Sequence, residues 1–190
     1  GLLYIDTRTG KSTRLNNHLG KLIIVESGIS KQTSAVLKKA RVYAQNAIQN
    51  VKLINDSFDI HSAGVKDYEK YAPYVSVKYL DHWFAAIHNH ILTQKAKKIL
   101  LDKKGDIVTL GKLMNEHQNI LDQRIQNTPE IMQKQMSSAI NAGALGTKII
   151  GSGGGGCMVA MVTVESKQKV IDAYLSEGAL AAYEVKLNSY

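Results

Sequence analysis

The feature that most constrains how this chain of 190 residues can fold is a glycine loop between two apolar runs, in the stretch TKIIGSGGGGCMVAMV at residues 147–162. Residues typical of β-strands flank the loop at 151–156 directly on both sides, whereas a flexible linker would join separately folded parts. The pattern therefore predicts a β-hairpin whose tip is almost entirely glycine. Cutting the chain at this loop would split the hairpin.

Two well-known phosphate-binding motifs do not fit this loop. Gly151, Gly153 and Gly156 satisfy the letters of G-x-G-x-x-G, but that motif leads into a helix, and residues 157–164 are typical of a strand. The Walker pattern fails because no Lys-Ser or Lys-Thr follows the glycines. Two interpretations remain: the loop lets the backbone approach an anion such as phosphate, or it is a tight turn that only packs against a neighbour.

The rest of the chain alternates short apolar runs with long stretches of helical periodicity. In the fourth helical stretch, Thr128 is a candidate N-cap, Pro129 suits the first position, and Gly143 supplies the stop. The predicted elements are a hairpin within 2–15, a strand at 21–27, a helix over 33–54, a connection at 55–74, helices over 76–101, 106–125 and 129–142, the two strands beside the glycine loop, a helix over 166–177 and a strand at 180–187.

This order predicts an α+β fold. With a helical insertion at about 55–127 set aside, it is the ferredoxin-like split βαβ plan, an antiparallel-containing sheet with two helices on one face. We expect residues 21–190 to form this domain and residues 1–20 to be remnant strands of an upstream domain. The start at Gly1, directly before an apolar run, suggests a cut inside a longer protein.

Composition narrows the function classes. With 44% hydrophobic and 21% charged residues, the chain is typical of a soluble globular protein, and it has no apolar run of about 20 residues that would cross a membrane. The net charge of +8 comes from scattered Lys and Arg without a basic stripe, so we expect no nucleic-acid partner. The single cysteine, Cys157, excludes an internal disulfide and favours the cytoplasm.

No metal site is expected. His82, His88 and His90 are close in sequence, but on a helix the last two point about 200 degrees apart and cannot chelate together. We interpret Trp83 as a core residue.

The stretch NAGALGTKIIGSGGGGCMVAMV at residues 141–162 resembles the third signature of the GHMP small-molecule kinases, the family that contains galactokinase, homoserine kinase and mevalonate kinase. The resemblance includes the small residues before the hairpin and Cys157 after the loop. It extends to GDIVTLGKLMNEHQNIL at 105–121 and to KLIIVESGISKQTSAVL at 21–37, and so spans nearly the whole chain.

The resemblance implies a transferase that moves the γ-phosphoryl group of ATP, with Mg²⁺, onto a hydroxyl of a small metabolite. The active-site loop would be Gly151, Ser152, Gly153, Gly154, Gly155 and Gly156. The family's main nucleotide loop and its catalytic residues lie in an N-terminal kinase domain that has no counterpart here. The chain would therefore be the C-terminal portion of a GHMP kinase, with no catalytic residue of its own, and inactive alone.

By the same resemblance, the substrate-side candidates are Ser27, Gly28, Ser30, Thr33, Asn115 and His117. A buried core histidine is the competing interpretation of His117. Galactokinases carry a tyrosine where this chain has aliphatic residues around Leu37. This difference weakens the case for galactose itself as the acceptor. The loop and the helix at 105–121 nevertheless favour a galactokinase-like sugar acceptor over mevalonate, and a mevalonate or heptose-type kinase is the alternative within the family. Alternatives of another class are a non-catalytic, ferredoxin-like anion-binding regulatory module and an oligomerisation scaffold; a homodimer is left open.

Overall fold

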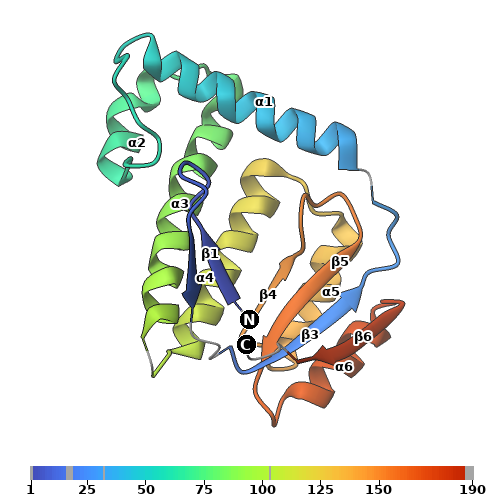
Figure 1. Cartoon of the computed structure of the whole chain (residues 1–190). Coiled ribbons are helices and arrows are strands. Elements are labelled where there is room, and N and C mark those ends of the chain that lie inside the picture. Colours follow the sequence, from blue (N-terminus) through green and yellow to red (C-terminus); the bar gives the residue numbers. More distant parts are fainter. Residues whose placement is uncertain (1, 16–18, 32, 103, 187–190) are drawn as a thin grey trace.

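The computed structural model describes residues 2–15, 19–31, 33–102 and 104–186, and for residues 33–37 only the backbone. Figure 1 shows a sheet with helices behind it, next to a set of long helices. The strands are β1 (Leu2–Ile5), β2 (Ser12–Leu15), β3 (Lys21–Glu26), β4 (Gly146–Ile149), β5 (Cys157–Val162) and β6 (Ala181–Val185). The α-helices are α1 (Thr33–Lys52), α2 (Val65–Tyr71), α3 (Leu80–Leu101), α4 (Ile107–Ile120), α5 (Glu130–Asn141) and α6 (Lys167–Ser176), and a π-helix at Leu121–Ile125 extends α4.

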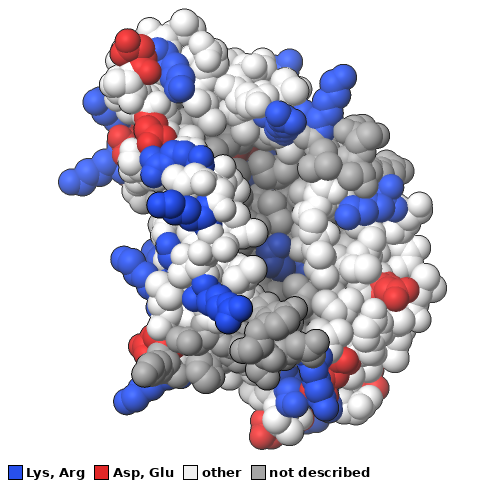
Figure 2. Space-filling view, in the orientation of Figure 1, with Lys and Arg blue, Asp and Glu red and all other residues white. Residues whose placement is uncertain are grey.

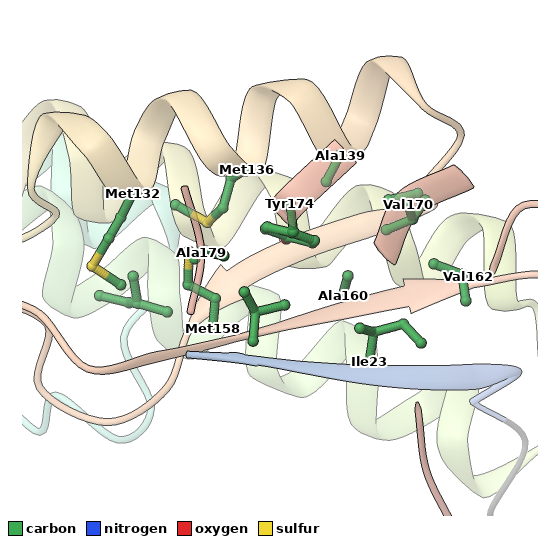
Figure 3. Packing of buried hydrophobic residues seen from close by; sticks show 13 residues of the cluster. Ile23, Met132, Met136, Ala139, Met158, Ala160, Val162, Val170, Tyr174 and Ala179 are labelled. Atoms are coloured by element: carbon green, nitrogen blue, oxygen red, sulfur yellow. The ribbon is translucent and has the colours of Figure 1, made fainter. Parts of the chain in front are cut away.

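The central sheet has the strand order β4-β5-β3-β6, and all neighbours are antiparallel. Because β5 lies between β3 and β4, the first two strands of the domain in sequence are separated in the sheet, which is the split arrangement. Helices α5 and α6 lie together on one face of this sheet (Figure 3). The predicted α+β, ferredoxin-like fold is confirmed.

The main core lies between the sheet and these two helices. Alternate residues of β5, Met158, Ala160 and Val162, are fully buried and point toward α5 and α6, as the two-residue period of a strand requires (Figure 3). Opposite them lie Met132 on α5 and Tyr174 on α6, both fully buried. The remaining residues of β5 face the other side of the sheet.

The start of α5 differs from the sequence prediction. Thr128 does not cap the helix: α5 begins at Glu130, and Pro129 is the cap residue without a side-chain hydrogen bond. The Thr128 hydroxyl is buried and instead accepts a hydrogen bond from Nε2 of Gln118 at 3.0 Å. Thr128 therefore forms a tertiary hydrogen bond with Gln118 instead of the local cap that its sequence context predicts. The stop at Gly143 is confirmed by its φ of +102°.

Helices α1 and α3 share a second core. Ala47 and Val51 on α1 pack with Trp83 and Ile87 on α3, all four fully buried, so Trp83 is a core residue as predicted. The connection at 55–74 is ordered and contains α2. The hairpin β1–β2 lies against α3, where Nε2 of Gln94 donates to the Tyr4 hydroxyl at 3.1 Å.

Candidate phosphate site at the glycine loop

The glycine loop lies at the tip of the β4–β5 hairpin, as predicted. The ladder ends at the pair Ile149 and Met158, and the N–H of Ile150 then donates to the carbonyl of Cys157 at 2.9 Å. The five loop glycines all have positive φ, a conformation that other L-residues rarely adopt: Gly151, Gly153, Gly154, Gly155 and Gly156. The conformation itself therefore requires glycine along the whole loop.

The loop packs on the segment that follows β3. The Ser27 hydroxyl donates to the carbonyl of Gly156 at 2.6 Å and accepts from the N–H of Ile29 at 3.1 Å. The N–H of Gly156 donates to the carbonyl of Ile29 at 2.9 Å. A Cβ on Gly155 would lie only 2.5 Å from the carbonyl oxygen of Ser30. Two regions that the sequence analysis selected separately, 27–30 and 151–156, thus form one unit.

The other two candidates after β3 differ from Ser27 and Ser30. Gly28 has a φ of +83° and is exposed, and a Cβ there would contact Leu180 rather than the loop. The side chain of Thr33, at the start of α1, lies outside the described residues.

Asn127 is a site residue that sequence reasoning missed. Its carbonyl accepts from the N–H of Gly154 at 2.6 Å, and its Nδ2 donates to the carbonyl of Ser152 at 2.9 Å. A Cβ on Gly153 would lie 2.4 Å from the carbonyl oxygen of Asn127. The preceding residue, Gln126, has left-handed backbone angles (φ 57°, ψ 45°), a strained state for a non-glycine residue.

The start of the loop, at Gly151 and Ser152, is suited to an anion. The N–H groups of Gly154 and Gly156 donate to the carbonyls of Asn127 and Ile29. Those of Gly151, Ser152, Gly153 and Gly155 donate to no acceptor in the described part of the chain, but Gly153 and Gly155 are buried, so the accessible N–H groups are those of the exposed Gly151 and the half-buried Ser152. The Lys31 ammonium lies 3.1 Å from where a Cβ of Gly151 would be, and its stem passes over Gly156. Uncovered backbone N–H groups beside a cation are a typical anion-binding arrangement.

Asn115 and His117 on α4 have different surroundings. Oδ1 of Asn115 accepts from the N–H of Thr147 at 2.9 Å, and its Nδ2 donates to the carbonyl of Leu145 at 3.1 Å. The amide is thus occupied at the start of β4. His117 is half-buried, and its Nδ1 has no partner among the described residues. Burial, and secondarily the charge of Lys148, lowers the pKa of His117 to about 4.

The three histidines on α3 do not converge. His82 is buried beside Tyr43, and burial lowers its pKa, whereas His88 stacks on Phe84 with ring centroids 3.7 Å apart. Within the described residues, no group of three or more His, Cys, Asp or Glu side chains is placed to hold a metal ion. No described helix is both long and apolar enough to span a membrane.

Fold and loop together define a ferredoxin-like domain with a glycine hairpin at the edge of its sheet. Residues 96–180 match the family model described as GHMP kinases C terminal. The mevalonate kinase of Thermococcus onnurineus is 39% identical over 90 residues, 46% of this chain and 26% of that protein. The galactokinase of Streptococcus mutans is 28% identical over 173 residues, 88% of this chain and 43% of that protein.

The fold of the chain is also similar to that of a solved galactokinase. The crystal structure of Lactococcus lactis galactokinase complexed with galactose has a TM-score of 0.82 at 17% identity, over 96% of this chain and 49% of that one. These matches and the shared fold support a GHMP kinase C-terminal domain in this chain. It spans less than half the length of the two relatives and about half of the solved galactokinase.

Proposed function

We propose that the full-length protein is an ATP-dependent small-molecule kinase and that this chain supplies one wall of its phosphoryl-transfer site. The observation that carries the proposal is the glycine loop, where the N–H groups of Gly151 and Ser152 have no acceptor in the described residues and the Lys31 ammonium lies beside Gly151. Phosphoryl transfer depends mainly on positioning and on neutralising charge on the phosphoryl oxygens. Backbone N–H groups in a loop held by hydrogen bonds, together with one cation, provide both.

Each part of the site has its own role in this proposal. The N–H groups of Gly151 and Ser152 and the Lys31 ammonium bind oxygens of the terminal phosphate. Ser27 and Asn127 hold the loop in shape from opposite sides through the hydrogen bonds to Gly156, Ser152 and Gly154. Because these groups are positioned before any ligand binds, they stabilise developing charge with little reorganisation.

The chain's own residues do not fit a Mg²⁺ ion at this loop. Residues 27–31 and 151–156 contain no carboxylate, and Mg²⁺ is held in proteins by carboxylates and phosphates. We therefore assign the magnesium ligands, most of the ATP site and the catalytic residues to an N-terminal kinase domain. That assignment also makes residues 1–190 alone inactive. A cytoplasmic location and a homodimer remain predictions.

A sugar is the acceptor we propose, with mevalonate or a heptose as the alternative within the same family. In sequence, the match to galactokinase covers 88% of the chain and that to mevalonate kinase covers 46% at higher identity. In structure, both kinases cover 96% of the chain, with a TM-score of 0.82 for the Lactococcus lactis galactokinase and 0.61 for the L. major mevalonate kinase. The experiment is to incubate the full-length protein with ATP, Mg²⁺ and a panel of hexoses, heptoses and mevalonate, and to follow ADP release and the phosphorylated product.

We expect ADP release with one sugar class and a phosphomonoester product. If mevalonate alone gives a product, the protein is still a kinase, but its acceptor is mevalonate and not a sugar. Absence of product with every acceptor, together with anion binding at the loop, would favour the regulatory module instead.

A further inference from the structure

A cavity separate from the glycine loop lies on the face of the central sheet opposite α5 and α6. Its volume is about 350 Å³, and it is bounded by Leu22, Val159 and Met161 of the sheet and by Leu92 and Leu113 of α3 and α4. We call it the apolar chamber. Figure 2 shows this side of the molecule hollowed between the helices and the sheet, with Lys or Arg atoms inside the hollow. Small-molecule sites begin at about this size and are mostly apolar.

The chamber contains few polar side chains, and one of them is a cation. Its lining includes Thr93, His117 and Lys148. Lys148 is on β4 between Thr147 and Ile149, which are buried on the α5 side, so strand alternation directs Lys148 into the chamber. Its Nζ donates to the carbonyl of Ile149 at 2.8 Å, which uses one of its three N–H bonds.

No carboxylate of the described residues pairs with Lys148. Burial lowers the pKa of its ammonium, which means that the charged form is poorly solvated there. Nδ1 of His117, which lines the same chamber, is buried without a partner in the described part of the chain. Buried charges and polar atoms are normally paired, so a ligand would supply Lys148 with a counter-ion, and His117 with a hydrogen-bond partner, that the described residues do not provide.

We propose that the apolar chamber binds a small aliphatic carboxylate, whose head group pairs with Lys148 and His117 and whose hydrocarbon body fills the space beside Leu22, Val159 and Met161. A volume of about 350 Å³ is at the lower end of the range for small-molecule sites, so octanoate, with its charged head and short aliphatic body, is a suitable probe. The site is separate from the glycine loop, and its occupancy does not require phosphoryl transfer.

The test is isothermal titration of the full-length protein with octanoate, with octanol and acetate as partial ligands. Octanol keeps the body without the charge, and acetate keeps the charge without the body. We expect saturable, one-to-one binding of octanoate, and at least tenfold weaker binding of each partial ligand. Equal affinity for octanol, or no saturable binding of octanoate, would overturn the proposal.

Two variants locate the site, and one serves as a control. Lys148→Met removes the charge at similar volume and is expected to weaken octanoate binding at least tenfold, whereas Lys112→Met, at an exposed position on α4, should leave it within twofold. Val159→Phe fills the chamber and leaves Lys148 in place, so it should abolish binding; it decides the question if Lys148→Met does not fold. Unchanged affinity in a folded Lys148→Met or Val159→Phe protein would exclude this chamber.

Discussion

The side-chain oxygen of Gln118 on α4 accepts a hydrogen bond from the backbone N–H of Ile149 on the edge strand β4, with N and O 2.9 Å apart. Asn115, one helical turn earlier, accepts from Thr147 in the same way. Helix α4 therefore takes the place of a fifth strand along this edge, and satisfies N–H groups that would otherwise be open to pairing with another chain. Gly111 and Gly146 allow this close approach, because a Cβ on either would lie about 2.5 Å or less from backbone oxygen of the other segment.

The first prediction concerns Gln118 itself. Gln118→Leu keeps the volume but leaves the N–H of Ile149 and the hydroxyl of Thr128 without partners, so we expect a loss of about 1–3 kcal/mol in the free energy of unfolding. Urea denaturation followed by circular dichroism measures it. Gln123→Leu, at an exposed position on the π-helix, is the control and should change stability by less than about 0.5 kcal/mol. Equal effects of the two would contradict the edge role.

The second prediction separates crowding from backbone strain in the loop. Gly153 and Gly178 have nearly the same φ, +79° and +81°, but a Cβ on Gly153 would meet the carbonyl of Asn127 at 2.4 Å, whereas one on Gly178 would meet nothing within 4 Å. Gly153→Ala should therefore destabilise the fold by about 1–3 kcal/mol more than Gly178→Ala. Thermal unfolding of both variants at one pH checks this. Similar losses would mean that the loop moves away from Asn127 freely.

The third prediction tests Asn127 as a positioning residue. Asn127→Ala removes the bond to the carbonyl of Ser152 and keeps the backbone bond to Gly154. On the proposed kinase function, we expect kcat of the full-length protein to fall about tenfold or more, with a smaller change in the KM for the acceptor. Asn119→Ala, at an exposed position on α4, is the matched control. A variant with normal kcat would show that the loop keeps its shape without this side chain.

The fourth prediction concerns Lys31, which has no carboxylate partner among the described residues. Lys31→Met should lower kcat/KM for ATP about 10- to 100-fold, because it removes the positive charge beside the loop. Lys31→Arg should restore a large part of the activity. Lys134→Met, an exposed lysine on α5, should have no effect. If steady-state kinetics show equal kcat/KM for Lys31→Met and Lys134→Met, the phosphate is not held here.

The fifth prediction is a pH dependence of stability due to His117. Its folded pKa of about 4 lies below the ordinary value of 6.5, so the unfolded chain binds more protons between these two values. The free energy of unfolding should therefore decrease as the pH falls from about 6.5 to 4, by about 1–3 kcal/mol once partial exposure is allowed for. His117→Gln should flatten this part of the curve, and His61→Gln, at an exposed position, should not. Parallel curves for the two variants would contradict it.

Local patterns in the sequence determined much of this fold. The glycine loop between two strand-like runs predicted the β4–β5 hairpin, because strand ends and glycine conformations are properties of neighbouring residues. The same holds for the individual helices and strands, because apolar residues recur in them at a period of 3.6 or 2. The order of these elements along the chain then identifies the split βαβ plan. The resemblance around residues 141–162 then led to the GHMP kinases, whose C-terminal family model matches residues 96–180.

Only the tertiary structure decided which side chains serve the loop and the sheet edge. Asn127 holds a loop 25 residues further along the chain, and Gln118 reaches a strand 31 residues away. Such pairs leave no periodic signal, because they depend on where whole elements pack. Thr128 illustrates the competition: its sequence context predicts a helix cap, but Gln118 takes its hydroxyl as a buried partner. The apolar chamber with Lys148 has the same origin, since its walls come from segments that meet only when the helices close over the sheet.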